Sequence, residues 1–179
     1  TEDAICDLFI YHFTSKTLQK LTDDVYAELQ PSWAPDGNSI LFATDKADHP
    51  SPDSLSYGPP RIALFNLTDS TIDYLSIANW AKHIDPQFSP DGQYIYFISD
   101  PDGFSNIYCY SLQSFKFFKI TDIATGVSGL TELAPALSVA SKNGKLAFSV
   151  FEKSGYRINT LEPHPPKEEY IVLSKDDYF

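Results

Sequence analysis

Few residues in this sequence have the types and spacing that catalysis requires. Gly126-Val127-Ser128-Gly129 approaches the Gly-x-Ser-x-Gly pattern that places a serine nucleophile on a sharp turn, but it lacks the second spacer. The segment also falls between strand-like runs, not between a strand and a helix. The sequence has no His-Glu-x-x-His zinc motif, no Gly-x-x-x-x-Gly-Lys phosphate loop and no Cys-x-x-Cys pair. We therefore expect no catalytic residue and no cofactor in this chain, and we interpret Ser128 as a loop residue.

Acidic and sulfur-containing residues are the other candidates for chemistry, as metal ligands. Asp100-Pro101-Asp102-Gly103 has two carboxylates of a calcium loop but not the remaining ligands, so a plain turn is favoured. Cys6 and Cys109 lie in strand-like apolar runs with no Cys or His at ligand spacing, which predicts two buried free thiols. Asp23-Asp24 and Asp176-Asp177 are interpreted as solvated turns or chain ends. The sequence predicts no metal site.

Composition limits the classes of partner. The chain has 179 residues, with 24 Asp and Glu against 13 Lys and Arg, which gives a net charge of −11. Nucleic acids and anionic lipid surfaces are bound mainly by clustered basic side chains, so this charge excludes nucleic acid as a partner and disfavours anionic lipid surfaces. Hydrophobic residues make up 42% of the chain, enough for a packed core, but they form no run long enough to span a membrane.

The elements that would position any site come from an internal repeat. Pro31 to Phe42 recurs 55 positions later as Pro86 to Phe97, and a degenerate third copy runs from Pro135 to Phe148. The recurring positions are Pro31, Trp33, Pro35, Asp36 and Gly37, then Pro86, Phe88, Pro90, Asp91 and Gly92, with Pro135 and Gly144 in the third copy. Two shorter strand-like runs follow each copy. Four short strands per unit, separated by turn residues, are typical of a β-propeller blade.

The repeated tetrapeptide has a conformational explanation. Proline presets the second position of a type I turn, aspartate tolerates the third, and Gly37 or Gly92 takes the left-handed conformation that leads into the next strand. We expect Pro31 and Pro86 at the start of a short strand, where a missing N–H is tolerated. Their neighbours Trp33 and Phe88 are expected to pack in the core between neighbouring blades.

These motifs resemble one known family. The pattern Pro-x-aromatic-(Ser/Ala)-Pro-Asp-Gly, then Ile-x-Phe, Ile-Tyr-x-x-x-Leu and a closing Leu/Ile-Thr-Asp, is similar to the TolB-like, WD40-like propeller repeat over about 7–161. The resemblance implies an all-β propeller in an extracytoplasmic, periplasmic setting. Related repeats occur in the propeller domains of prolyl-oligopeptidase-type and other peptidases. The sequence departs from TolB in lacking its N-terminal α/β domain, and the third copy has lost its Pro-Asp-Gly.

The number of blades follows from the repeat. With strands lettered A (innermost) to D, we expect a half blade at 7–22 (strands C and D), full blades at 29–77 and 85–121, and a last blade at 133–174 whose D strand is Tyr170 to Ser174. This makes about three and a half blades, whereas closed propellers have about 4 to 8. We therefore expect the chain to be part of a larger propeller. Completion of the ring by a second copy and an open arc covered by other domains remain alternatives.

Loop lengths suggest where a site would lie. The A-to-B and C-to-D turns share one face of a blade and are tight, while the B-to-C and D-to-A connections share the other face and are long, at 46–60, 78–85, 100–105 and 122–132. Function concentrates in loops on a rigid scaffold. The candidate binding residues on this loop-rich face are Tyr57, Trp80, His83, Asp102, Phe104, Thr125 and Ser128.

Two kinds of residue on this face have competing interpretations. The ring of Trp80 can pack over the blade edge or face a ligand, and the sequence favours neither. His49 and His83 are interpreted as solvated loop histidines, since nothing in the sequence pairs them.

The leading hypothesis is a non-catalytic module that binds a protein or peptide, or the remaining blades of the same polypeptide. The alternative is the propeller domain of a larger peptidase, which gates or docks substrate while the catalytic residues lie outside this chain. A propeller that binds sugars or other small molecules is a third hypothesis without a supporting motif.

Overall fold

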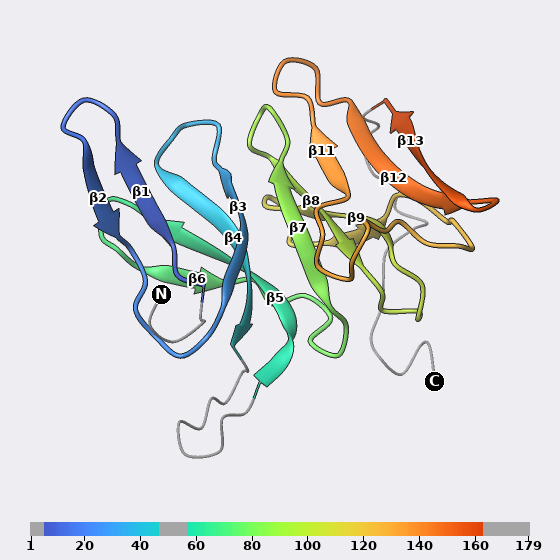
Figure 1. Ribbon diagram of the computed structural model, residues 1–179, viewed down its shortest axis with the longest axis horizontal. Coiled ribbons are helices and arrows are strands. Elements are labelled where there is room, and N and C mark those ends of the chain that lie inside the picture. The colour runs from blue at the N-terminus through green and yellow to red at the C-terminus, as the bar shows by residue number, and fades with distance from the viewer. Residues whose placement is uncertain (1–5, 47–56, 163–179) are drawn as a thin grey trace.

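A computed structural model describes residues 6–46 and 57–162 of the chain. All regular elements in these ranges are strands, and they form four antiparallel sheets arranged side by side (Figure 1). The predicted all-β fold built from propeller blades is confirmed. His49, most of the 46–60 connection and the predicted strand at Tyr170 to Ser174 lie outside the described residues.

Each sheet corresponds to one repeat unit. The half-blade pairs β1 (Phe9–His12) with β2 (Thr17–Lys20). Blade 1 has the order β3 (Glu28–Trp33), β4 (Ser39–Lys46), β5 (Tyr57–Asn66) and β6 (Ile72–Tyr74). Blade 2 has the order β7 (His83–Phe88), β8 (Tyr94–Ser99), β9 (Asn106–Ser111) and β10 (Phe117–Lys119). Blade 3 contains β11 (Leu137–Val139), β12 (Leu146–Glu152) and β13 (Gly155–Leu161).

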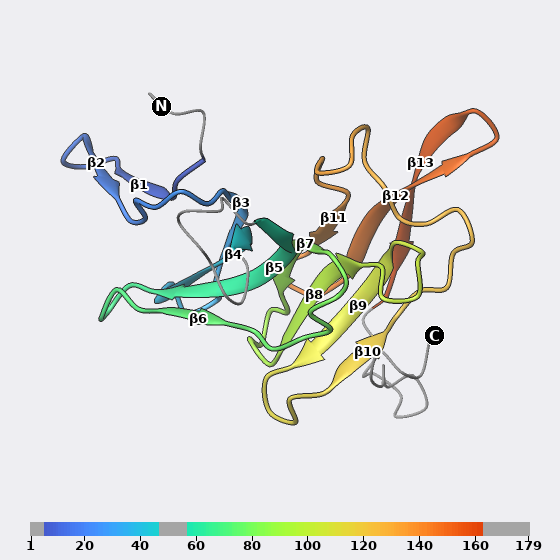
Figure 2. The same cartoon turned by 90° about the horizontal axis from the view of Figure 1, so that it is seen from below.

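The first strands of the three blades lie next to one another. Strand β7 contacts both β3 and β11, and the outer strands spread away from this centre (Figure 2). In each full blade the strand order follows the chain order, so hairpins build the whole sheet. The first strand of every blade therefore occupies the innermost position, as the sequence predicts for strand A.

The hairpin turns have the conformation that their glycines allow. Gly37 has a φ of 71° and Gly92 a φ of 69°, and their amides donate to Ala34 O and Ser89 O, each at 2.9 Å. In the third copy the amide of Gly144 instead donates to Ala140 O, four residues back, at 2.8 Å. The strands on either side of this turn pair at the same separation as in blade 1, Val139 with Leu146 and Trp33 with Ile40, so the extra residues of the third copy lie between Pro135 and Val139 and not in the turn.

The repeated prolines lie within their strands and not at the start, which corrects the prediction. Both follow a residue with positive φ, Gln30 at 54° and Asp85 at 55°. The pairing register shifts between Leu29 and Ser32 in blade 1 and at the same point in blade 2. A β-bulge at the edge of the innermost strand thus accommodates the missing N–H of each proline.

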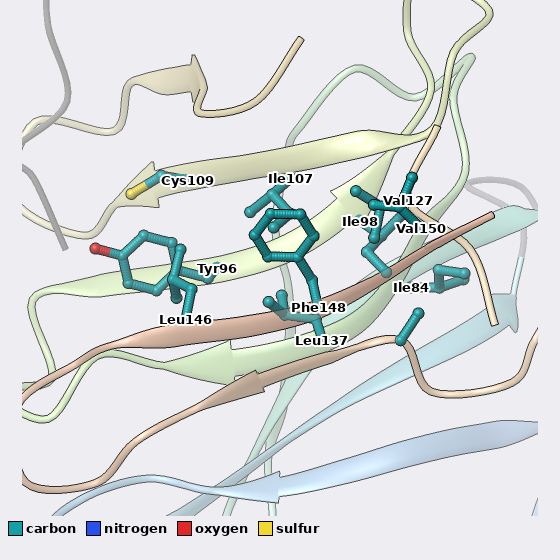
Figure 3. Packing of buried hydrophobic residues seen from close by; sticks show 11 residues of the cluster. Ile84, Tyr96, Ile98, Ile107, Cys109, Val127, Leu137, Leu146, Phe148 and Val150 are labelled. Atoms are coloured by element: carbon teal, nitrogen blue, oxygen red, sulfur yellow. The ribbon is translucent and has the colours of Figure 1, made fainter. Parts of the chain in front are cut away.

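Hydrophobic clusters fill the three seams between neighbouring sheets. Figure 3 shows the cluster between blades 2 and 3, where Tyr96 and Ile98 of β8 face Leu146 and Phe148 of β12. The other clusters join blade 1 to blade 2 and the half-blade to blade 1. The sheets are therefore held together by three hydrophobic clusters between neighbours, and not by a single central core.

Two predictions of burial are wrong. Trp33 is 54% exposed, whereas its counterpart Phe88 packs against the cluster between blades 1 and 2. Phe88 has a complete blade on the side it faces, and Trp33 has only the two-stranded half-blade on that side. Cys109 is buried, which raises the pKa of its thiol to about 12, but Cys6 is exposed because it lies ahead of β1.

Candidate functional site

A pocket of about 340 Å³ lies at the seam between blades 1 and 2, where the long connections meet. Its walls come from the end of β4, the start of β5, the connection after β6 and the start of β7. The lining residues are Lys46, Gly58, Pro59, Arg61, Leu75, Ser76, Ile77, Ala78, Asn79, Trp80, Ala81 and His83. We call it the seam pocket. Its volume is in the range of pockets that hold small ligands or a few side chains.

His83 belongs to the wall of the seam pocket and is only 1% exposed. Its Nε2 lies 3.1 Å from the carbonyl oxygens of Ile77 and Ala78, and its Nδ1 lies 2.9 Å from Ser99 Oγ. Two carbonyl acceptors assign the proton to Nε2, so Nδ1 accepts from the serine hydroxyl. Burial lowers the pKa of His83 to about 4. The interpretation of His83 as a solvated loop histidine is therefore wrong.

The side chain of Trp80 contacts the turn after β8, which agrees with the packing interpretation. Its side chain is half-buried, and its indole N–H donates to the carbonyl oxygen of Pro101 at 3.4 Å. The same residue lines the seam pocket. The ring thus packs against the turn after β8 and also borders the pocket.

Two cationic side chains lie at the rim of the seam pocket. Lys46 Nζ lies 3.0 Å from Asp24 Oδ2 and 5.8 Å from the ring centroid of Tyr74, and Arg61 lies 5.1 Å from the same centroid. Burial acts to lower the pKa of Lys46, but its contacts with Asp24 and Tyr74 outweigh this and raise the pKa. Lys46 therefore stays charged, and the rim can contact an anionic group.

The remaining predicted site residues do not converge on one place. Tyr57 is exposed and its ring lies 6.2 Å from that of Tyr26, beside Gly58 at the pocket wall. Phe104 and Thr125 are exposed and line neither this pocket nor the next. Ser128 borders a second pocket of about 240 Å³, at the seam between blades 2 and 3.

Asp102 has a structural role in the turn before β9. It accepts hydrogen bonds from Lys119 Nζ at 2.7 Å and from the amide of Phe104 at 3.1 Å. Burial acts to raise the pKa of its carboxyl, but these two donors outweigh that effect and lower the pKa. A carboxylate held by a lysine and a backbone amide is consistent with the predicted turn.

The Gly-Val-Ser-Gly segment is shaped by packing. A Cβ on Gly129 would lie 2.6 Å from Ala134 O, and Gly126 has a φ of 75°. The carbonyl of Ser128 accepts from Ser149 Oγ at 2.7 Å, and its amide donates to Ser149 O at 3.1 Å. Glycine is therefore required at 126 by the backbone conformation and at 129 by the close approach of Ala134. This agrees with the interpretation of Ser128 as a loop residue.

Sequence reasoning missed a polar link between the innermost strands. Asp85 Oδ2 accepts from the amides of Ala136 at 2.8 Å and Leu137 at 2.6 Å, in the next blade. Gln30 Oε1 accepts from the amide of Asp85 at 2.7 Å, and Gln30 Nε2 donates to Leu133 O at 2.7 Å. The signal was available: a polar residue precedes the repeated proline in both full copies. We call Gln30 and Asp85 the strand clamp.

Two further properties bear on the class of protein. Within the described ranges, no three His, Cys, Asp or Glu side chains are grouped so that they could hold a metal ion. In the same ranges no helix has the length and apolarity needed to cross a membrane.

Comparison of the sequence with protein-family models and with curated proteins finds no match. Solved structures do match. TolB from Acinetobacter baumannii is 18% identical with a TM-score of 0.63, and the match covers 87% of this chain and 35% of that one. TolB from Agrobacterium tumefaciens is 19% identical with a TM-score of 0.59 and coverages of 82% and 49%. A puromycin hydrolase is 16% identical with a TM-score of 0.60 and coverages of 84% and 22%.

The chain therefore spans less than half the length of each of these structures. Their sequence identities are low, so the likeness concerns the fold. The repeat motifs, the four antiparallel sheets and the structural matches agree, and the chain has the fold of a TolB-like β-propeller.

Proposed function

We propose that the chain is a non-catalytic propeller module that recognises a protein or peptide segment on its loop-rich face, with the seam pocket as the recognition site. The observation that carries this proposal is the pocket itself, formed where two blades and their long connections meet. Concave, largely preformed sites of this size are the usual places for ligand recognition. By resemblance to TolB, we place this activity in the periplasm.

The connection that forms the pocket is held in place from several sides. His83 contacts the carbonyls of Ile77 and Ala78, and Trp80 donates to Pro101. The amide of Lys82 donates to Asp100 Oδ1 at 3.0 Å. A wall fixed before the ligand arrives lowers the entropic cost of binding. This rigidity supports recognition without a large rearrangement of the loop.

The lining indicates the chemistry of the partner. Leu75, Ile77 and Ala81 provide apolar surface, the Trp80 ring provides a flat aromatic contact, and Lys46 and Arg61 provide positive charge. An extended segment with an acidic side chain next to an apolar one complements this combination. Charge of this sign on the rim also favours selection over basic segments.

The test is a selection of peptides on the purified chain. Peptides enriched from a random display library are synthesised and their affinity is measured by calorimetry. Trp80→Ala should weaken binding by at least about tenfold, because aromatic anchors dominate such sites. Phe104→Ala is the matched control, because Phe104 is an exposed aromatic residue on the same face outside the pocket, and it should change the affinity by less than about twofold.

A second pocket variant keeps the test informative if Trp80→Ala fails to fold. Ser76 is exposed and lines the pocket, so Ser76→Tyr fills it without removing a buried contact. Thr68→Tyr, in the exposed tight turn between β5 and β6, is its control. Ser76→Tyr should abolish binding and Thr68→Tyr should not. Enriched peptides that bind both pocket variants as tightly as the wild type would refute the proposal.

A second function has a specific observation in its favour. The match to puromycin hydrolase covers 84% of this chain but only 22% of the enzyme, so the fold also occurs as a minor part of a hydrolase. In that setting the seam pocket would dock or gate a substrate segment for a catalytic domain outside this chain. Sequencing the parent gene on both sides distinguishes the two: a serine or zinc hydrolase motif in the same reading frame favours the peptidase role.

A further inference from the structure

The seam pocket and the second pocket lie on the two faces of blade 2 and share one wall. Ala81 and His83 line the seam pocket, whereas Lys82 and Ile84 line the second pocket. This alternation is that of a strand, in which successive side chains point to opposite faces of the sheet. Strand β7 contacts both β3 and β11 (Figure 1), so the pockets lie on either side of a single strand. A peptide that leaves one pocket therefore reaches the other by crossing the end of blade 2.

The second pocket has an apolar floor and a fixed wall. Ile84 and Ile98, which lie opposite each other in the sheet, and Val127 are buried side chains that line it. The amide of Val127 donates to Ser105 O at 2.6 Å, which holds the 122–132 connection against blade 2. A volume of about 240 Å³ admits one side chain of the size of leucine, and burying such a side chain is favourable.

The charges at the two pockets differ. At the second pocket Lys82 Nζ lies 3.8 Å from Asp100 Oδ2 and 3.9 Å from Glu132 Oε1, so this ammonium group faces two carboxylates. The seam pocket is lined by two cationic side chains, and an acidic group bound there would compete with Asp24 for Lys46. An acidic side chain is therefore favoured in the seam pocket and disfavoured in the second pocket, where an uncharged aliphatic side chain fits.

The spacing of the two pockets selects a peptide conformation. Packed sheets lie about 10 Å apart, so the two seams on either side of blade 2 are separated by about the same distance. In a polyproline II helix, side chains three residues apart lie on one face and are separated by about 9 Å. In an extended strand, side chains on one face are separated by about 7 Å for residues two apart and by about 13 Å for residues four apart. The polyproline II spacing therefore fits the two pockets best.

We propose that a peptide in the polyproline II conformation spans both pockets, with an acidic side chain in the seam pocket and an aliphatic side chain, three residues away, in the second pocket. This inference rests on the proposed function, because it extends the peptide assigned to the seam pocket. The ring of Trp80 borders the seam pocket, and its N–H donates to Pro101 O. Prolines of the peptide find an aromatic surface there, as in other sites that bind polyproline II segments.

Synthetic peptides with capped ends are the probes, and NMR titration of the full chain measures their affinity. The first is Leu-Asp-Pro-Pro-Leu, made also in the reverse order, and the tighter of these two directions is kept. One or three prolines in place of two take the far leucine off the face of the aspartate, so these peptides should bind at least about tenfold more weakly. Replacing the far leucine by alanine should cost about as much, because the second pocket then stays empty.

Filling the second pocket tests the far leucine alone. Thr131 is exposed and lines this pocket, so Thr131→Tyr should weaken the leucine peptide at least about fivefold and leave the alanine peptide within about twofold. Thr125→Tyr is the matched control, because Thr125 is an exposed residue of the same connection that lines neither pocket, and it should leave both affinities unchanged. The methyl signals of Ile84 and Ile98 should shift with the leucine peptide and not with the alanine peptide.

The seam-pocket variant Ser76→Tyr separates this inference from the proposed function. If Ser76→Tyr leaves the affinity of both peptides unchanged, the seam pocket is not the recognition site and both proposals fail. If it weakens both peptides, but the leucine peptide binds no more tightly than the alanine peptide or shifts no methyl signal of Ile84 and Ile98, only the two-pocket inference is overturned. Tighter binding of the peptide with one or three prolines would contradict the polyproline II spacing. If none of these peptides binds, this inference fails, and the peptides selected on the chain still test the proposed function.

Discussion

At the scale of single residues, the repeat places two buried titratable groups at one structural position. Glu28 and His83 each begin the innermost strand of a blade, opposite Thr44 and Ser99. Burial raises the pKa of Glu28 to about 7, although the Thr22 hydroxyl donates to its Oε2 at 2.7 Å. Burial lowers the pKa of His83 to about 4. In both cases desolvation disfavours the charged form.

These shifts act on stability with opposite signs. Between about pH 4.5 and 7 the folded chain retains the Glu28 proton that the unfolded chain loses, so stability falls as pH rises through this window. Between about pH 6.5 and 4 the unfolded chain protonates His83 before the folded chain does, so stability falls as pH decreases. Each effect is worth at most about 3 kcal/mol. We expect them largely to cancel in the wild type near pH 5 to 6.5.

Glu28→Gln removes the ionisable group whose effect on stability opposes that of His83. The variant should gain stability relative to the wild type as pH rises from 5 to 8, by up to about 3 kcal/mol, because it has no buried carboxylate to ionise. Urea unfolding across this range measures the difference. A difference between variant and wild type that stays constant with pH would contradict the assignment of Glu28.

At the scale of elements, the repeated turn depends on one glycine. Gly92 has a φ of 69°, and a Cβ there would meet Pro35 only at ordinary van der Waals distance, so the conformation and not the space restricts this position. Gly92→Val should therefore cost about 1–2 kcal/mol of unfolding free energy. Gly155→Val is the control, because Gly155 lacks a positive φ and nothing lies near its added Cβ. Equal losses for both variants in thermal or urea unfolding would refute the explanation.

The strand clamp gives a second prediction at this scale. Asp85→Ala leaves the amides of Ala136 and Leu137 without their buried acceptor, and each unsatisfied group costs about 1–3 kcal/mol. Asp85→Asn retains one acceptor oxygen and should lose less. In a hydrogen-exchange experiment the amides of Ala136 and Leu137 should lose protection in Asp85→Ala. Unchanged protection would show that the clamp does not join the two blades.

The sequence predicted the strands and turns better than the contacts that each strand makes with its neighbours. The Pro-Asp-Gly turns and the strand runs depend on local chemistry, so Gly37, Gly92 and the hairpins around them could be recognised. The bulge before each proline was missed, because a positive φ at Gln30 or Asp85 depends on contacts with the next strands. The wrong interpretation of His83 has a similar origin, since its partner Ser99 is on the paired strand and Ile77 is in the preceding connection.

At the scale of the whole molecule, the arrangement of the blades determines which side chains are buried and which come together in a pocket. Trp33 was expected in the core and is exposed, because burial there requires strands beside β1. The candidate site residues, predicted from loop length alone, separate between two seam pockets and the open surface. Loop length indicated the face, but only the packing of blade 1 against blade 2 brought Trp80, His83 and Arg61 to one pocket.

At this scale, part of the acidic net charge is explained by aspartates in turns. Several aspartates support turns: Asp36 Oδ1 accepts from Asn38 N at 3.0 Å, and Asp91 Oδ1 accepts from Gln93 N at 3.0 Å. The net charge of −11 is thus partly a consequence of turn chemistry. Two cationic side chains, Lys46 and Arg61, line the seam pocket, where an acidic segment would compete with Asp24 for Lys46.

The most direct test of the central claim is to map a bound peptide on the chain by NMR. A peptide selected on the wild-type protein is titrated into the isotope-labelled chain, and amide shift changes are recorded for each residue. We predict that the changes concentrate at Lys46, at 58–61 and at 75–83, the walls of the seam pocket. Changes concentrated at the tight turns around Asp36 and Asp91, on the opposite face, would contradict the claim.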